Sequence, residues 1–261
     1  VATTRATRVT GTRADGVAFS IEQGAANNIL LANGGVLTVE SDTSSDKTQV
    51  NMGGREIVKT KATATGTTLT GGEQIVEGVA NETTINDGGI QTVSANGEAI
   101  KTKINEGGTL TVNDNGKATD IVQNSGAALQ TSTANGIEIS GTHQYGTFSI
   151  SGNLATNMLL ENGGNLRVLE GHRAEKIILD QEGGLLVNGT TSAVVVDEGG
   201  ELLVYPGGEA SNCEINQGGV FMLAGKASDT LLAGGTMNNL GGEDSDTIVE
   251  NGSIYRLGTD G

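Results

Sequence analysis

The sequence has few of the residues that stabilise small disulfide-rich or aromatic-rich domains. Among 261 residues there is no tryptophan, one proline, one cysteine and two histidines, and aromatic residues make up 2%. Cys213 has no partner for an internal disulfide, and we expect it to fill a strand as a small residue. Because no run of about 18 apolar residues occurs, no membrane-spanning helix and no direct membrane contact are predicted.

The strongly negative net charge argues against nucleic acids and anionic membranes as partners. The formal net charge is −16, from 15 basic and 31 acidic residues. Nucleic acids and anionic membrane surfaces attract basic patches, so neither is expected to bind. The charge is unevenly spread: residues 1–120 carry 10 basic and 14 acidic side chains, and residues 121–261 carry 5 and 17. The C-terminal half therefore holds −12 of the total.

Glycine, by contrast, is abundant and regularly placed. There are 42 glycines, and many of them form Gly-Gly pairs. These pairs, together with single glycines in similar positions such as Asp15-Gly16 and Tyr145-Gly146, recur every 16 to 20 residues. A fixed period of this size indicates a repeat architecture. Corners that need a positive φ favour glycine. The spaced pairs are Gly34-Gly35, Gly53-Gly54, Gly71-Gly72, Gly88-Gly89, Gly107-Gly108, Gly163-Gly164, Gly183-Gly184, Gly199-Gly200, Gly218-Gly219 and Gly234-Gly235.

Apolar residues recur in columns between these pairs. Residues two apart face the same side of a strand. A single coil leaves its apolar side chains exposed, whereas coils stacked about 4.8 Å apart bury them in columns. We therefore predict an all-β fold, a right-handed parallel β-helix of about 13 coils with a period near 18–19 residues. The columns include Val39, Val58, Val76, Val93 and Val112; Leu37 and Leu110; and Leu30, Val50, Leu69, Ile85, Ile104, Val195 and Leu231.

Three polar residues interrupt the second column. Glu56, Gln74 and Gln91 stand where Leu37 and Leu110 stand in other coils. Either this side faces solvent there, or the side chains stack as a ladder near the corner. We favour the solvent-facing interpretation.

A longer repeat overlies the short one. Val9-Thr10-Gly11-Thr12 returns as Ile139-Ser140-Gly141-Thr142, and Phe19-Ser20-Ile21 returns as Phe148-Ser149-Ile150. The offset of 129 to 130 residues suggests duplication of a block of coils. We predict one β-helical domain over 1–261, built of two related blocks at about 9–138 and 139–261, and interpret it as a fragment of a longer protein.

These motifs carry a family resemblance. The chain resembles the passenger region of AIDA-type self-associating autotransporter adhesins, the group of antigen forty-three and TibA. The resemblance rests on the unit Thr-Thr-x-Asn-x-Gly-Gly-x-Gln-x-Val, clearest at Thr83–Val93, and on the block that contains Val-Thr-Gly-Thr and Phe-Ser-Ile. The resemblance implies a bacterial cell-surface protein, exported through the outer membrane, that mediates autoaggregation, biofilm formation and adhesion. Some members carry heptoses on Ser or Thr, and no glycosylation site is assigned here.

Catalytic chemistry is not expected. Parallel β-helices also include polysaccharide-degrading enzymes, but their sites need long loops around clustered carboxylates, and the turns here are short and uniform. His143 and His172 are expected at the surface without a catalytic role. No catalytic residue, cofactor or metal is predicted. Calcium is the minority alternative to a solvated acidic face, with the candidates Glu161, Glu182, Glu198, Glu243, Asp244 and Asp246.

The leading hypothesis is self-association with identical molecules on neighbouring cells. Residues at one position of successive coils form a ladder, so weak contacts are repeated. We predict this ladder on the outward neighbours of an apolar column, in the less acidic half, with basic and acidic groups nearby. The expected neighbours are Lys47, Lys59, Lys61, Lys101, Glu73, Glu82 and Asp87. The alternative is an adhesin for host glycan or extracellular matrix, although sugar sites favour exposed Trp or Tyr. The ladder candidates are Gln49, Thr68, Thr84 and Lys103.

Overall fold

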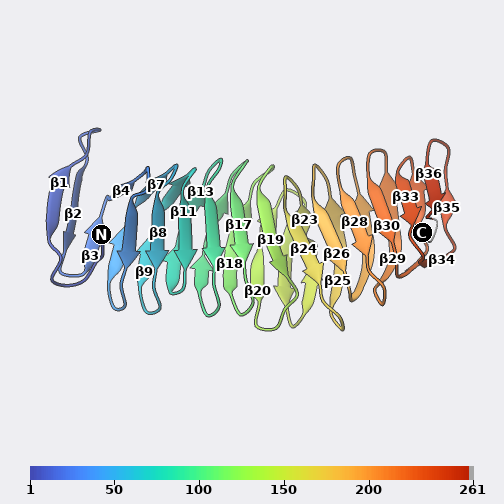
Figure 1. Cartoon of the computed structure of the whole chain (residues 1–261), viewed down its shortest axis with the longest axis horizontal. Helices are drawn as coiled ribbons and strands as arrows, with labels where there is room; N and C mark the ends of the chain where they lie inside the picture. Colours follow the sequence, from blue (N-terminus) through green and yellow to red (C-terminus); the bar gives the residue numbers. More distant parts are fainter. Residues whose placement is uncertain (259–261) are drawn as a thin grey trace. The chain divides into compact units, whose positions relative to one another are not determined.

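The structure, a computed structural model, describes residues 1–258. Every regular element among them is a β-strand, so the predicted all-β parallel solenoid is confirmed (Figure 1). The chain forms two compact units, each defined by residues that contact one another more than they contact the rest. The first holds Val1–Ala127 and Glu138–Tyr145, and the second holds Ala128–Ile137 and the residues from Gly146 onward.

The strands are short, mostly two to eight residues. The first unit holds β1 (Val9–Thr12), β2 (Ala18–Glu22), β3 (Ala25–Asn27), β4 (Leu30–Leu31), β5 (Val36–Val39), β6 (Ser44–Asp46), β7 (Gln49–Asn51), β8 (Arg55–Val58), β9 (Thr63–Thr65), β10 (Thr68–Thr70), β11 (Glu73–Val76), β12 (Val79–Asn81), β13 (Thr84–Ile85), β14 (Ile90–Val93), β15 (Glu98–Ile100), β16 (Lys103–Ile104), β17 (Thr109–Val112), β18 (Lys117–Gln123) and β20 (Glu138–His143).

The second unit holds the remaining strands. They are β19 (Ala128–Ser132), β21 (Gly146–Ser151), β22 (Leu154–Thr156), β23 (Leu159–Leu160), β24 (Asn165–Val168), β25 (Arg173–Leu179), β26 (Gly184–Val187), β27 (Thr190–Val196), β28 (Glu201–Val204), β29 (Glu209–Asn216), β30 (Val220–Leu223), β31 (Lys226–Ser228), β32 (Leu231–Ala233), β33 (Thr236–Asn239), β34 (Glu243–Ser245), β35 (Ile248–Val249) and β36 (Ile254–Leu257).

One turn of the solenoid is three short strands, as in β12, β13 and β14. In such turns each strand pairs in parallel with its counterpart one turn later, so that Val93 lies between Val76 and Val112. The strand after the glycine corner recurs five times in the first unit and seven times in the second, so there are about 12 turns rather than 13. The count differs because two of the weaker markers are not coil corners. Asp15-Gly16 closes the antiparallel pair β1–β2, and the strand after Tyr145 pairs antiparallel with β22.

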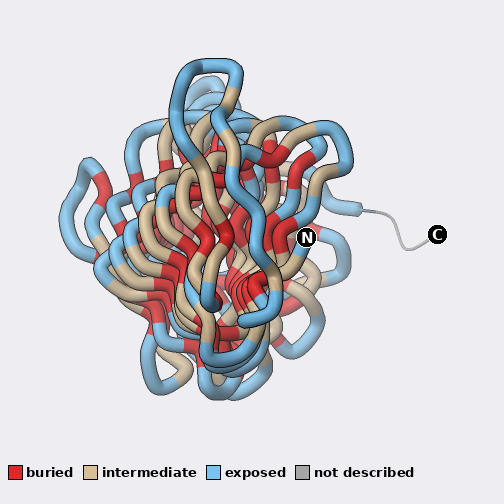
Figure 2. The backbone as a smooth tube through the Cα atoms, turned by 90° about the vertical axis from the view of Figure 1, so that its left-hand side faces the viewer, coloured by how far each residue is buried: buried red, intermediate tan, exposed pale blue. Residues whose placement is uncertain are grey.

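The core follows the predicted columns, with one correction. Val39, Val58, Val76 and Val93 are fully buried, and buried positions alternate with more exposed ones along the strands (Figure 2). The column before the glycine pair was partly misassigned. Leu30 is 43% exposed while Leu31 is buried. Where two apolar residues are consecutive, the register of the neighbouring turns decides which one points inward. The same shift turns Val195 and Leu231 outward and buries Val196 and Leu232.

The polar residues in the second column are also buried, so the solvent-facing interpretation is wrong. Glu56, Gln74 and Gln91 are 0% exposed and pair in register between Leu37 and Leu110. The Gln74 amide donates to Glu56 (2.8 Å), and the Gln91 amide donates to Gln74 (2.8 Å). Inward hydroxyls complete the network; one lies on β6 and the others come immediately before β10, β13 and β16. Buried polar groups need such partners. The hydroxyl donors are Ser45 (3.0 Å) and Thr67 (2.7 Å) to Glu56, Thr83 (3.2 Å) to Gln74, and Thr102 (2.9 Å) to Gln91.

The two glycines of a corner have different structural roles. Gly88 has φ 76°, which a side chain rarely adopts. Gly89 does not need a positive φ, but a Cβ there would lie 2.7 Å from the carbonyl oxygen of Leu69 in the preceding turn. The first glycine therefore makes the turn, and the second lets successive turns approach.

Candidate functional site

The predicted ladder of outward residues exists in the first unit. Gln49, Thr68, Thr84 and Lys103 lie on β7, β10, β13 and β16 and are paired in register, each opposite the next. Lys103 is exposed, and the other three are partly exposed. Successive turns therefore place hydrogen-bonding or charged groups at strand spacing, about 4.8 Å apart.

The two ends of this ladder are apolar, which the sequence did not indicate. Leu30 pairs with Gln49, and Val122 pairs with Lys103. They are 43% and 40% exposed. The ladder is thus a polar stripe bounded by two exposed aliphatic side chains, so its surface offers dispersion contacts as well as hydrogen bonds.

Some of the expected neighbours belong to a different part of the turn. Glu73 lies on β11, in the other sheet, with an ion pair to Arg55 (3.3 Å). Lys59 follows β8 and pairs with Glu77 (3.7 Å). Lys47, Lys101 and Glu82, in contrast, occupy the left-handed bends just before the ladder strands, with φ between 55° and 59°. These three exposed charged side chains lie beside the ladder.

An asparagine ladder runs along the corner that follows. The amide of Asn105 donates to Asn86 (2.9 Å), and the amide of Asn124 donates to Asn105 (2.8 Å). Asn86 also donates to the hydroxyl of Thr70 (3.3 Å). Each amide is both donor and acceptor, so the stack satisfies itself from turn to turn and fixes the corner beside the polar stripe.

In the second unit the same corner carries acids. Glu161, Asp180 and Asp197 occupy successive turns, and the Asp197 carboxylate accepts a hydrogen bond from the amide of Asn216 (2.8 Å). Burial, a hydrogen bond to Glu161 and the charges of Glu161 and Asp197 raise the pKa of Asp180 to about 7. Neighbouring carboxylates disfavour ionisation, and one shared proton relieves the repulsion.

Asp180→Asn is expected to remove a pH dependence of stability. Because the folded state holds the Asp180 proton more tightly than the unfolded chain does, its contribution is complete below about pH 4 and is lost as the pH rises toward 7. The variant should match the parent at pH 4. At pH 8 it should be more stable by on the order of 1 kcal/mol, since partial exposure screens the repulsion. Urea unfolding at both pH values measures this, and equal differences at pH 4 and pH 8 would contradict it.

The calcium candidates are not gathered into a site. Glu161 is buried, whereas Glu182 and Glu198 are exposed. Asp244 accepts hydrogen bonds from Tyr255 (2.9 Å) and Thr247 (2.7 Å). Glu243 and Asp246 are exposed, the latter in a bend. Within residues 1–258 no group of three or more Asp, Glu, His or Cys side chains is arranged to hold a metal ion. The solvated acidic face stays the preferred interpretation.

Both histidines lie within hydrogen-bond distance of a neighbour, and the cysteine is buried. His143 is buried, contrary to expectation, and its Nδ1 accepts from the backbone of Tyr145 (3.0 Å). His172 is partly exposed and its Nδ1 lies 2.9 Å from the hydroxyl of Thr133. Cys213 lies in a strand, β29, as predicted. It is also buried, and burial raises the pKa of its thiol to about 12. No helix in the described part of the chain is long and apolar enough to cross a membrane.

Comparison with known proteins decides the family. The model of the adhesin of bacterial autotransporter systems, described as a probable stalk, matches residues 10–72, 74–127 and 140–200, more than half of the chain.

This chain belongs to the autotransporter adhesin stalk family.

The stalk is 76% identical over 243 residues to the probable autotransporter YpjA of Escherichia coli K12, covering 90% of the chain and 16% of YpjA. It is 86% identical over 123 residues to the Escherichia coli protein YdhQ, covering 47% of the chain and 29% of YdhQ. The chain therefore spans less than a third of the length of these relatives. Among solved structures it is similar to the glycosylated TibA55-350 fragment (TM-score 0.52, 31% identity), with 90% of this chain and 89% of that one covered.

Membership sets the location and the general role. Autotransporter adhesins are exported through the outer membrane and exposed at the bacterial surface, and this stalk is a passenger of that kind. The stalk family and the solenoid fold together indicate a non-enzymatic role.

Proposed function

We propose that this stalk joins neighbouring cells by self-association through the polar stripe of the first unit, Gln49, Thr68, Thr84 and Lys103, and so supports autoaggregation and biofilm formation. The in-register stripe is the observation that supports the proposal. An identical stripe on a second molecule meets it with the same spacing. Each contact is weak, but contacts repeated at every turn act together.

Charge favours this half of the chain. Residues 1–120 carry net −4, so two copies repel less than two copies of the C-terminal half would. Lys103 of one copy meets exposed acids such as Glu82 or Asp87 on the other. Leu30 and Val122 add apolar contact at the ends of the stripe. Exposed charge pairs are screened within a Debye length of about 8 Å at physiological ionic strength, so aggregation should weaken as salt is raised.

The triple variant Thr68→Gly, Thr84→Gly and Lys103→Glu tests the stripe. Cells displaying it should aggregate about tenfold less than cells displaying the parent, because repeated contacts are lost together. The matched control is Thr92→Gly, Thr111→Gly and Lys61→Glu. It makes the same changes on and beside the other sheet, where Thr92 and Thr111 are also paired in register. The readout is the sedimentation of displaying cells at equal surface level. Equal aggregation of both triples would place the interface elsewhere.

A groove in the second unit favours the alternative, adhesion to host glycan or matrix. It has a volume of about 370 Å³ and runs over β27, β29, β31 and β34. Ser211, Ser228 and Ser245 pair in register along it, beside the register Glu209, Lys226 and Glu243. The relative TibA is named an adhesin/invasin. Binding of the purified stalk to a glycan or matrix array, abolished by Ser211→Asp with Ser228→Asp, would support this role over self-association.

A further inference from the structure

In the buried polar network of the first unit, a hydroxyl and a primary amide meet at one carboxylate oxygen. The Thr67 hydroxyl donates to Oε1 of Glu56 (2.7 Å), and Nε2 of Gln74 donates to the same Oε1 (2.8 Å). The Ser45 hydroxyl donates to the other carboxylate oxygen, Oε2 (3.0 Å), and so fixes the carboxylate. A hydroxyl that is hydrogen-bonded to a base is an activated nucleophile. The base here also contacts the amide nitrogen that such a nucleophile would displace.

The carbonyl oxygen of the same amide is held by donors. Oε1 of Gln74 accepts hydrogen bonds from Nε2 of Gln91 (2.8 Å) and from the Thr83 hydroxyl (3.2 Å). Donors fixed on a carbonyl oxygen stabilise the negative charge that develops there when a nucleophile adds to the carbonyl carbon. A nucleophile with its base, and an acyl group with donors on its oxygen, are the parts that acyl transfer requires.

This group of side chains is closed to water. Thr67, Glu56 and Gln74 are each 0% exposed. Leu37 is paired in register with Glu56 in the preceding turn, and Gln91 is paired with Gln74 in the following turn. The site therefore lies inside the stack, with a turn on either side. Exclusion of water strengthens the polar contacts and protects a reactive acyl product from hydrolysis.

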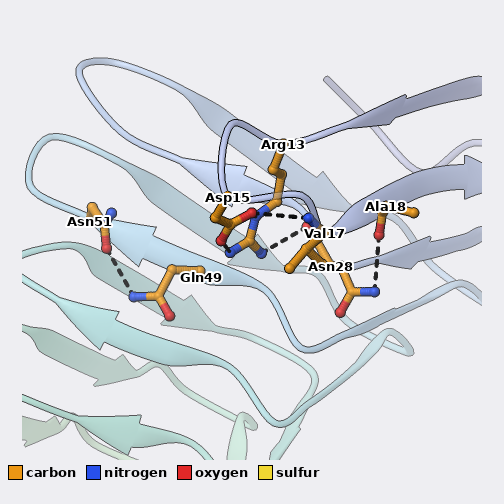
Figure 3. A network of polar contacts seen from close by, with 7 residues as sticks. All are labelled: Arg13, Asp15, Val17, Ala18, Asn28, Gln49 and Asn51. Atoms are coloured by element: carbon orange, nitrogen blue, oxygen red, sulfur yellow. Dashed lines mark hydrogen bonds and ion pairs between the residues drawn. The ribbon is translucent and has the colours of Figure 1, made fainter.

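The outward-facing amides of the same turns are arranged differently. On β7 the amide of Gln49 donates to the amide oxygen of Asn51 (2.9 Å), and both side chains are partly exposed (Figure 3). In this contact an amide meets another amide instead of a hydroxyl, and water reaches both. The combination of nucleophile, base and acyl group is thus a property of the interior and not of the outer polar stripe.

We propose that Thr67 and Gln74 react with each other to form an internal ester. Oγ1 of Thr67 bonds to Cδ of Gln74, and the Cδ–Nε2 bond breaks. Glu56 takes the hydroxyl proton and gives it to the departing nitrogen, which leaves as ammonia, so the carboxylate is restored and no other reactant is needed. The two residues lie on either side of the corner Gly71-Gly72, immediately before β10 and within β11. The ester therefore closes a loop across this corner and stabilises the turn by restricting the unfolded chain.

Mass spectrometry of the whole purified chain tests the proposal. The parent should be lighter than its sequence by the mass of one ammonia molecule. A protease that cuts after glutamate cleaves the denatured chain at Glu73, between Thr67 and Gln74. Only the ester then keeps the two peptides joined, and mild alkali should separate them and leave a glutamate in place of Gln74. This measurement on the parent decides the proposal even where a variant does not fold.

Variants assign the roles of the side chains. Thr67→Val removes the nucleophile and Glu56→Gln removes the base, so both should keep the full sequence mass, whereas Thr67→Ser retains a hydroxyl and should still lose ammonia. Thr102→Val is the matched control. The Thr102 hydroxyl donates to Oε1 of Gln91 (2.9 Å), a similar buried contact without a carboxylate on that hydroxyl, and its removal should leave the ammonia loss unchanged.

Two results would overturn the proposal. One is a parent chain with its full sequence mass and separable peptides after cleavage at Glu73. The other is an ammonia loss that persists in Thr67→Val, which would place the reaction at another amide, such as an asparagine that precedes a glycine.

Discussion

Val93→Asp is expected to lower the free energy of unfolding by about 4 kcal/mol. Val93 is 0% exposed and lies in register between Val76 and Val112. A carboxylate there has no partner, and an uncompensated buried charge is among the most costly substitutions. Because stacked turns depend on their neighbours, the loss should spread to β11 and β17.

Hydrogen exchange combined with urea unfolding measures both effects. Thr92→Asp is the control, since Thr92 is the adjacent outward residue on the same strand and should cost less than about 1 kcal/mol. Faster exchange in β11, β14 and β17 is expected for the Val93 variant alone. Unfolding curves that coincide with those of the parent would show that this column does not face the core.

Gly183→Ala is expected to cost about 3 kcal/mol, and Gly184→Ala to be close to neutral. The two are neighbours in one glycine pair, but a Cβ at Gly183 would lie 1.8 Å from the carbonyl oxygen of Leu160, whereas at Gly184 the nearest atom is 3.8 Å away. Neither has a positive φ, because Glu182 takes the left-handed position at this corner (φ 72°).

Thermal unfolding of the two alanine variants compares them directly. Each carries the same chemical change, so the control is built into the pair. Similar melting temperatures for both would mean that successive turns are not packed as closely as the structure shows at this corner.

The periodicity could be predicted from the sequence because every turn needs the same residue types at similar positions. Glycine pairs, the valine column that includes Val93, and the ladder of Gln49 and Thr68 all follow from a constant spacing of strand and corner. Prediction failed at two places. At Leu30, where two apolar residues are consecutive, the inward residue was misassigned by one. At Gly183, where the spacing of the glycine pairs changes, the pair was aligned one residue out of register.

The buried polar network could not be derived from one strand. In the sequence Glu56 interrupts an apolar column, and no local pattern indicates that Ser45 and Thr67, each 11 residues away, donate hydrogen bonds to it. Partners that satisfy a buried group come from the facing side of the turn, which becomes visible only once the turns are stacked. The hairpin at Asp15 was missed for a different reason: its turn residues match those of a coil corner.

Beads coated with the purified chain give the most direct test of self-association, because no other surface protein is present. They should aggregate without any added partner, disperse as the salt concentration is raised, and stay dispersed when they carry the Thr68, Thr84 and Lys103 triple variant. Parent beads that remain dispersed at low salt would contradict the account.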